Sequence, residues 1–283
     1  MPELPEVETI RQYLQTVLPG HTIEAVDRLD ARIVKHSPLT ADAMVAQLPG
    51  KTVTGVERVG KFLLVRFKSK EALVLHLGMS GRLVVGPAEE WYQPHTHLAL
   101  RVDGQHLRLI DPRRFGRVAW VTQGSALGTR LGVDPLSARF TARRLQELLA
   151  GRVVPLKTAL LNQALIAGLG NIYADEALFL ARLNPKRPAG SLADSDAKTL
   201  VRGIRRVLRL ALKNRGTSFS DYVDALGHPG DNQRFLNVYG RAQEPCPRCR
   251  TPIVLRVIGG RSSHFCPKCQ PWTDENHLVA KGE

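Results

Sequence analysis

Residues 246–269 read CPRCRTPIVLRVIGGRSSHFCPKC and contain all four cysteines of the chain, as two Cys-X-X-Cys pairs separated by sixteen residues. Each pair is a tight turn that can aim two thiolates at one point, and two such turns can close a tetrahedron around Zn²⁺. The β-rich residues between them carry Gly259-Gly260 at their centre, which predicts a hairpin that joins the pairs. Two disulfides are the alternative interpretation. We predict one zinc ion, structural because four thiolates leave no open position. Its ligands are Cys246, Cys249, Cys266 and Cys269.

Positive charge is concentrated in the same half of the chain. The 283 residues carry 40 Lys and Arg against 26 Asp and Glu, which gives a net charge of +14. Residues 1–135 hold 17 basic and 14 acidic side chains, whereas residues 136–283 hold 23 and 12. Such a one-sided surplus is typical of a nucleic-acid-binding protein, with an anionic membrane surface as the competing partner.

The sequence argues against membrane and exported proteins. No stretch approaches the ~18 consecutive apolar residues of a membrane helix. The N-terminal MPELPEVETI is acidic and lacks the basic start and apolar run of a secretory signal. We therefore expect a cytoplasmic protein that does not contact membranes.

Hydrophobic periodicity separates a β-rich half from a helical half. Pro5 begins a helix with an apolar face at helical spacing. From Thr22 to about Val121, short apolar segments separated by Gly, Pro and Asp predict a β-sandwich or barrel. Residues 122–140 are typical of a linker. Helices are predicted at residues 141–151, 156–168, 171–183 and 195–216. The fold class is therefore α+β.

Three segments carry residues suited to DNA contact. Asn171 follows Gly168 and Gly170 where a helix begins, so free N–H groups there can bind a phosphate, although a glycine-bearing turn with an Asn cap is the simpler interpretation. The DPRRFG turn at residues 111–116 presents two arginines and a phenylalanine, which suits groove contacts and a stacking wedge. The HLGMSG turn at residues 76–81 has an apolar tip, which is otherwise explained as core.

The N-terminus carries a candidate nucleophile. Removal of Met1 would leave Pro2 with a free secondary amine, and an ordinary α-amino group has a pKa of about 7.7–8.0. Such an amine condenses with a carbonyl-level carbon to give an iminium, which labilises neighbouring bonds. Glu3 can supply or take protons beside it. The simpler alternative is that Pro2, Glu3 and Glu6 merely begin the first helix.

Six motifs, in order along nearly the whole chain, resemble bacterial formamidopyrimidine-DNA glycosylase. They are MPELPEVET, HLGMSG, DPRRFG, GLGNIYADE, VYGR followed by CPRC, and the final CPKCQ. The resemblance implies a bacterial, nucleoid-associated and monomeric enzyme of base-excision repair. It would remove 8-oxoguanine opposite cytosine and ring-opened formamidopyrimidines from damaged double-stranded DNA, and then cut the backbone as an abasic-site lyase.

The resemblance also implies an architecture of four parts. A helix and a β-sandwich form a catalytic domain over residues 1–135, and a helix–two-turn–helix domain covers residues 136–240. A β-hairpin zinc finger follows at residues 241–270. The tail at residues 271–283 extends past the point where the family typically ends.

Catalytic roles follow by resemblance. Pro2 would attack C1′ of the damaged nucleotide, and Glu3 would donate a proton. Glu6 would support the site. Lys61 matches the family lysine that contacts a phosphate and takes part in β-elimination. Arg261 matches the family arginine that binds the phosphates at the lesion and is associated with δ-elimination.

Further positions match DNA contacts of the family. Met79, Arg113 and Phe115 would fill the gap left by the flipped base, with Arg113 facing the estranged cytosine. Residues 217–230 resemble the lesion-recognition loop. The remaining DNA-binding positions are His76, His95, Arg152, Lys157 and Asn171.

Two other hypotheses remain at this stage. A sister enzyme of the endonuclease VIII type would share the architecture and prefer oxidised pyrimidines. A zinc-ribbon DNA-binding protein without catalysis would tolerate replacement of Pro2, but it leaves the acidic pair beside the terminus unexplained.

Overall fold

The computed structural model describes residues 2–87, 92–122, 131–219 and 221–272. It contains two compact units, Met1–Arg130 with Ala211–Arg234, and Leu131–Leu210 with Phe235–Glu283. The segment expected as one helical domain, residues 136–240, is therefore divided, because residues 211–234 pack in the first unit. From residue 273 onwards, the expected tail lies outside the described residues.

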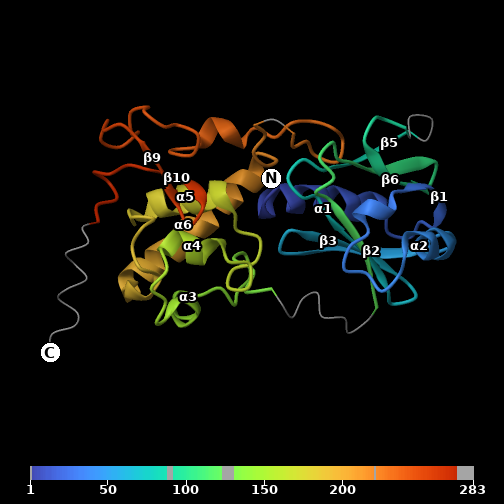
Figure 1. The fold of residues 1–283 in the computed structure, drawn as a ribbon, viewed down its shortest axis with the longest axis horizontal. Helices are drawn as coiled ribbons and strands as arrows, with labels where there is room; N and C mark the ends of the chain where they lie inside the picture. Colours follow the sequence, from blue (N-terminus) through green and yellow to red (C-terminus); the bar gives the residue numbers. More distant parts are fainter. Residues whose placement is uncertain (1, 88–91, 123–130, 220, 273–283) are drawn as a thin grey trace. The chain divides into compact units, whose positions relative to one another are not determined.

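The first unit begins with helix α1 (Leu4–Val17), which packs on strand β2 (Figure 1). Pro5 lies in its first turn, where the missing N–H costs no helical hydrogen bond. Val7, Ile10 and Leu14 are buried at helical spacing and face the core. The predicted N-terminal helix is confirmed.

Two antiparallel four-stranded sheets follow. In the first, the order is β1 (Ile23–Leu29), β6 (Thr96–Val102), β7 (Gln105–Ile110) and β5 (Arg82–Pro87). In the second, it is β2 (Val53–Val59), β3 (Phe62–Phe67), β4 (Ala72–His76) and β8 (Arg117–Val121). Helix α2 (Ala41–Gln47) and the 3₁₀ turn η1 (Ala31–Ile33) lie between β1 and β2 in the chain. Side chains from both sheets and from α1 share one core, so the β-sandwich is confirmed over the barrel.

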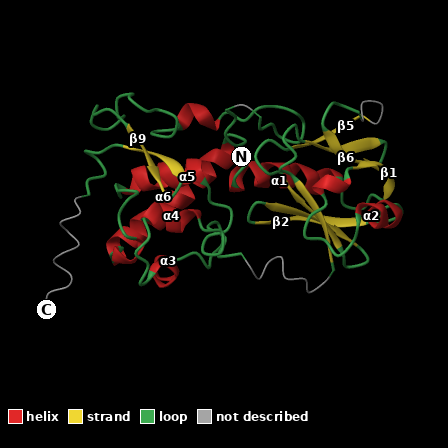
Figure 2. Cartoon of the chain, in the orientation of Figure 1, coloured by secondary structure: helices red, strands yellow, loops and turns green. Residues whose placement is uncertain are grey.

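The second unit is helical, with one hairpin (Figure 2). Its helices are α3 (Ala142–Leu149), α4 (Leu156–Leu161), α5 (Asn171–Ala181) and α6 (Asp194–Lys213), whose last residues belong to the first unit. The second unit also contains the short 3₁₀ turn η3 (Ala189–Ser191). Another 3₁₀ turn, η4 (Asn232–Phe235), spans the point in the chain where the first unit ends at Arg234 and the second resumes. Strands β9 (Val254–Ile258) and β10 (Arg261–Phe265) form the predicted hairpin.

One helix is shorter than predicted. The sequence favours a helix over residues 156–168, but α4 ends at Leu161. The Asn162 side chain accepts the Ala164 N–H at 2.9 Å, which replaces a helical hydrogen bond. Ile166 then pairs with Val133 in an isolated bridge. Among the described residues, no helix is long and apolar enough to cross a membrane.

Candidate functional site

The N-terminal segment is buried against residues 211–234 of its own unit. Pro2 is buried, and Glu3 and Glu6 are only 2% and 1% exposed. One Glu6 carboxylate oxygen accepts the Glu3 N–H at 2.8 Å, and the other accepts the Thr217 N–H at 2.8 Å. Glu6 therefore fixes the backbone next to Pro2 and joins it to Thr217. The expected removal of Met1 concerns a residue outside the described part of the chain.

Gly216 and Tyr222 complete this junction. Gly216 has φ +84°, and a Cβ there would lie 2.9 Å from the Tyr222 ring and 3.0 Å from Glu6, so glycine is needed for both reasons. The Tyr222 hydroxyl donates to the Arg215 carbonyl at 3.1 Å. Burial, with the negative charge of Glu6, raises the pKa of Tyr222, so its hydroxyl stays protonated as a donor.

Lys61 and His76 lie close enough to affect each other electrostatically. Lys61 is 7% exposed and sits in the turn between β2 and β3. Nδ1 of His76 accepts the Gly78 N–H at 3.1 Å, which places the ring proton on Nε2. Burial, then the charges of Arg117 and Lys61, lowers the pKa of His76 to about 4. His76 is therefore a neutral donor at physiological pH.

The two turns predicted to enter DNA both expose their tips. Met79 is 43% exposed and Phe115 is 42% exposed. The Arg113 guanidinium lies over the Phe115 ring, 4.6 Å from its centroid, so the two side chains form one stacked pair. His95 is exposed with φ +68°, and its carbonyl accepts the Asp111 N–H at 2.9 Å.

In the second unit, Asn171 and Arg261 lie on adjoining elements. Asn171 is the first residue of α5 after Gly170, and its Nδ2 donates to Ser262 Oγ at 3.2 Å. Arg261 begins β10 and is exposed. Arg152 is also exposed, and its Nε donates to the Leu148 carbonyl at 2.7 Å. The structure thus brings Asn171 together with the Arg261 strand.

Lys157 requires a correction. Its side chain is completely buried, the ammonium lies 2.6 Å from Asp175 Oδ1, and it donates to the Ser262 carbonyl at 2.5 Å. A buried ammonium held by a carboxylate and a carbonyl cannot reach a phosphate without breaking both contacts. The predicted direct DNA contact of Lys157 therefore does not fit this geometry.

The four cysteines gather as predicted. Their sulfur atoms lie within 4.8 Å of one another. Individual sulfur–sulfur distances are 3.4 Å for Cys249–Cys269, 3.5 Å for Cys249–Cys266 and 3.9 Å for Cys246–Cys269. Zinc–sulfur bonds of about 2.3 Å in a tetrahedron require separations of about 3.8 Å, whereas a disulfide requires about 2.05 Å. The site fits one structural zinc ion.

Buried carboxylates form a second set that the sequence analysis missed. Asp175 accepts the His264 N–H at 2.8 Å and so links α5 to β10. Glu176 accepts the N–H groups of residues 237–239 at 2.8–3.0 Å, just before the zinc finger. Both residues belong to the GLGNIYADE motif, so their place in it was the available signal.

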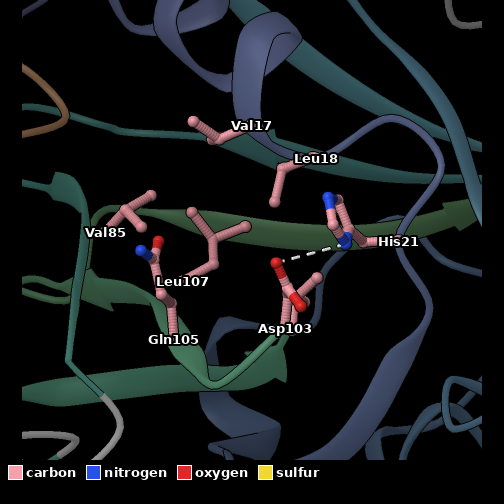
Figure 3. Close-up of a pocket in the computed structure, with 8 residues that line it drawn as sticks. Val17, Leu18, His21, Val85, Asp103, Gln105 and Leu107 are labelled. Carbon is pink, nitrogen blue, oxygen red and sulfur yellow. Dashed lines mark ion pairs between the residues drawn. The ribbon is translucent and has the colours of Figure 1, made fainter.

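A cavity of about 210 Å³ in the first unit is separate from the predicted site residues (Figure 3). Val17 and Leu18, at the end of α1 remote from Glu3, form part of its apolar wall. At the rim, His21 Nδ1 lies 3.3 Å from Asp103 Oδ2. None of the predicted catalytic or DNA-binding residues lines this cavity.

Three family models together match most of the chain. The formamidopyrimidine-DNA glycosylase N-terminal domain matches residues 1–118, its H2TH domain matches residues 131–222, and the zinc finger found in FPG and IleRS matches residues 243–271. The chain belongs to the formamidopyrimidine-DNA glycosylase family. The resemblance seen in the motifs is confirmed.

Relatives of this glycosylase family cover the chain almost end to end. The formamidopyrimidine-DNA glycosylase of Symbiobacterium thermophilum is 47% identical over 96% of this chain and 90% of the relative. The formamidopyrimidine-DNA glycosylase of Roseiflexus sp. is 44% identical over 95% of this chain and 100% of the relative. The crystal structure of MutM (FPG) from Thermus thermophilus has a TM-score of 0.85 at 42% identity, over 96% of this chain and 100% of that one. The Lactococcus lactis Fpg complex with abasic-site DNA has a TM-score of 0.88 at 33% identity, over 95% of this chain and 100% of that one.

Family membership settles the class of protein. The chain is a DNA glycosylase with abasic-site lyase activity that acts on damaged DNA in repair, and it carries a structural zinc finger. The hypothesis of a zinc-ribbon protein without catalysis is wrong. The predicted α+β architecture, with its sandwich, H2TH region and zinc hairpin, is confirmed.

Proposed function

We propose that this enzyme excises oxidised purines, 8-oxoguanine and formamidopyrimidines, from duplex DNA through a covalent intermediate at Pro2. The observation that carries the proposal is the Glu6 junction. Glu6 holds the Glu3 N–H at 2.8 Å, so the peptide that follows Pro2 has a fixed orientation in a buried site. A nucleophile gains reactivity when its approach is preset in this way. A mutant of Lactococcus lactis Fpg has been crystallised with DNA containing Fapy-dG, which supports the lesion class.

The chemistry of Pro2 consists of one substitution followed by two eliminations. Its nitrogen bonds to C1′ as the glycosidic bond breaks, and Glu3 supplies the proton that accompanies the departing base. The attached nitrogen then loses its proton and the C1′–O4′ bond opens, with a proton passing to O4′, which gives an iminium. This iminium acidifies the C2′ proton, and loss of that proton expels the 3′ phosphate by β-elimination. δ-Elimination then expels the 5′ phosphate. Lys61 assists the first elimination and Arg261 the second, each while contacting a phosphate.

The other predicted side chains bind the duplex. Met79, Arg113 and Phe115 occupy the space of the everted nucleotide, which partly replaces the lost stacking. Asn171 contacts phosphate near the lesion, and His76 donates from its neutral Nε2. His95 and Arg152 are exposed cationic or donor groups suited to the backbone. Damaged double-stranded DNA is thus the partner, bound by a single copy of the chain.

Borohydride trapping tests this proposal. Wild-type enzyme incubated with an 8-oxoguanine duplex and borohydride should form a stable protein–DNA adduct, and peptide mass spectrometry should place the bond at Pro2. Pro2→Gly, or a blocked N-terminus, should lower trapping at least about tenfold, because the secondary amine is lost. Pro38→Gly, an identical change at an exposed position, is the control.

Two outcomes would contradict the proposal. Undiminished trapping of Pro2→Gly through a lysine would refute the assigned nucleophile. Preferential excision of dihydrouracil in competition with 8-oxoguanine would favour the pyrimidine-directed alternative, for which a Lactococcus lactis Fpg complex with an oxidised pyrimidine is a precedent.

A further inference from the structure

The two exposed tips of the first unit belong to turns that lie against each other. The turn at residues 76–81 follows β4, and the turn at residues 111–116 joins β7 to β8. Gly78 has φ +63°, and a Cβ added there would lie 2.4 Å from the Phe115 carbonyl carbon. The two backbones are therefore in direct contact just beside Met79 and Phe115.

Asp111 connects the same two turns by hydrogen bonds. Its side chain is fully buried, and Oδ1 accepts the Ser80 hydroxyl at 2.6 Å and the Arg113 N–H at 3.2 Å. Oδ2 accepts the Gly116 N–H at 2.6 Å. One carboxylate thus receives donors from both turns, and each donor lies within one residue of an exposed tip or is part of it.

Burial makes this arrangement cooperative. Ser80 is 2% exposed, so neither its hydroxyl nor the Asp111 carboxylate can turn to water when the contact between them is lost. A buried carboxylate is stable only while its donors are in place, so the position of one turn determines the position of the other. Such preorganisation lowers the entropy cost of inserting both tips into DNA at once.

We propose that Asp111 and Ser80 are positioning residues that hold Met79 and the Arg113–Phe115 pair as one preassembled wedge for base eversion. The inference rests on the proposed function, in which those three side chains occupy the gap in the duplex. Asp111 and Ser80 act through the turns and do not touch the substrate. Their contribution is greatest where a paired base must be expelled, and smallest where no base remains to be removed.

Ser80→Ala is the variant that tests the wedge, because it deletes one donor and leaves Asp111 with two backbone donors. Single-turnover excision of 8-oxoguanine from a fully paired duplex should slow about 10-fold, the usual effect of losing a hydrogen bond to a charged group. Strand cleavage at a preformed abasic site should stay within about twofold of wild type. The fluorescence change of 2-aminopurine next to the lesion should slow together with excision. Asp111→Asn should slow excision of 8-oxoguanine from the paired duplex more than Ser80→Ala does.

The control is Ser69→Ala, which removes a hydroxyl bonded to the Glu71 carboxylate at 2.5 Å in an exposed turn of the same unit. It should leave both rates unchanged. Equal losses of Ser80→Ala on the paired lesion and the abasic site, or no loss on either, would overturn the inference. Failure of the wild-type enzyme to form the Pro2 adduct would instead refute the proposed function, so the two failures are distinguishable.

Discussion

At the scale of single residues, the two oxygens of Glu6 connect the N-terminal segment with a part of the chain 211 positions away. A carboxylate that accepts two backbone N–H groups satisfies donors at a helix start and at Thr217 simultaneously. The junction therefore sets Pro2 and the beginning of the 217–230 segment together. Thr217 and the backbone next to Pro2 are accordingly linked through one side chain.

His76 provides a prediction at this scale. Its pKa is lowered from 6.5 to about 4 in the folded protein, so between these values the unfolded chain binds more protons. The contribution of neutral His76 to stability is fully present above pH 6.5 and is lost as the pH falls towards 4. From pH 7 to pH 4.5 the loss should be about 2 kcal/mol.

Urea unfolding across this pH range checks the prediction. Wild type should lose stability more steeply than His76→Gln below pH 6.5, because carboxylate titrations common to both cancel in the difference. Parallel curves for the two proteins would show that His76 keeps an ordinary pKa. His36→Gln, at an exposed histidine of the same unit, should behave as wild type.

At the scale of elements, a buried ion pair joins two helices to the hairpin that carries Arg261. Lys157 on α4, Asp175 on α5 and the Ser262 carbonyl on β10 meet within hydrogen-bond distance. His264 on the same strand donates its N–H to Asp175. The pair therefore sets the register of β10 against α5, and with it the spacing of Arg261 from Asn171.

Removing one partner of this ion pair should destabilise the folded protein. Lys157→Met and Asp175→Leu should each lower the free energy of unfolding by about 3–5 kcal/mol, because each leaves one uncompensated buried charge. The double variant Lys157→Met, Asp175→Leu should recover much of the loss. Denaturant unfolding in a double-mutant cycle measures this coupling, and additive losses would mean that the pair contributes no interaction energy.

At the scale of the whole molecule, the uneven charge determines how DNA binding depends on salt. Residues 136–283 hold 23 basic and 12 acidic side chains, so that half supplies most of the attraction to phosphate. If about six phosphates are neutralised, affinity should fall on the order of 10³-fold between 50 and 200 mM salt.

Variants separate the contributions to that salt dependence. Arg261→Ala should reduce the slope of log affinity against log salt by about 1, because one phosphate contact is lost. Lys157→Met should leave the slope unchanged, since its ammonium is buried. Fluorescence anisotropy with a lesion duplex provides the measurement. A reduced slope for Lys157→Met would restore that lysine as a direct contact.

Features that depend on local pattern and spacing could be predicted from the amino-acid sequence. Two Cys-X-X-Cys pairs predict the zinc hairpin, short apolar segments separated by Gly, Pro and Asp predict a sandwich or barrel, and the ordered motifs indicate the family. These signals act over a few residues, where turn geometry and side-chain periodicity decide the outcome. Even there, the end of α4 was misplaced, because the Asn162 side chain competes with the helix backbone.

Contacts between groups far apart in the chain became known from the folded structure. Glu6 with Thr217, Ser80 with Asp111, and Lys157 with Asp175 are separated by between 18 and 211 positions. The return of residues 211–234 to the first unit has the same origin. Such contacts depend on burial, which commits a charged group to whichever donor the packed chain brings to it, and no local pattern specifies that partner.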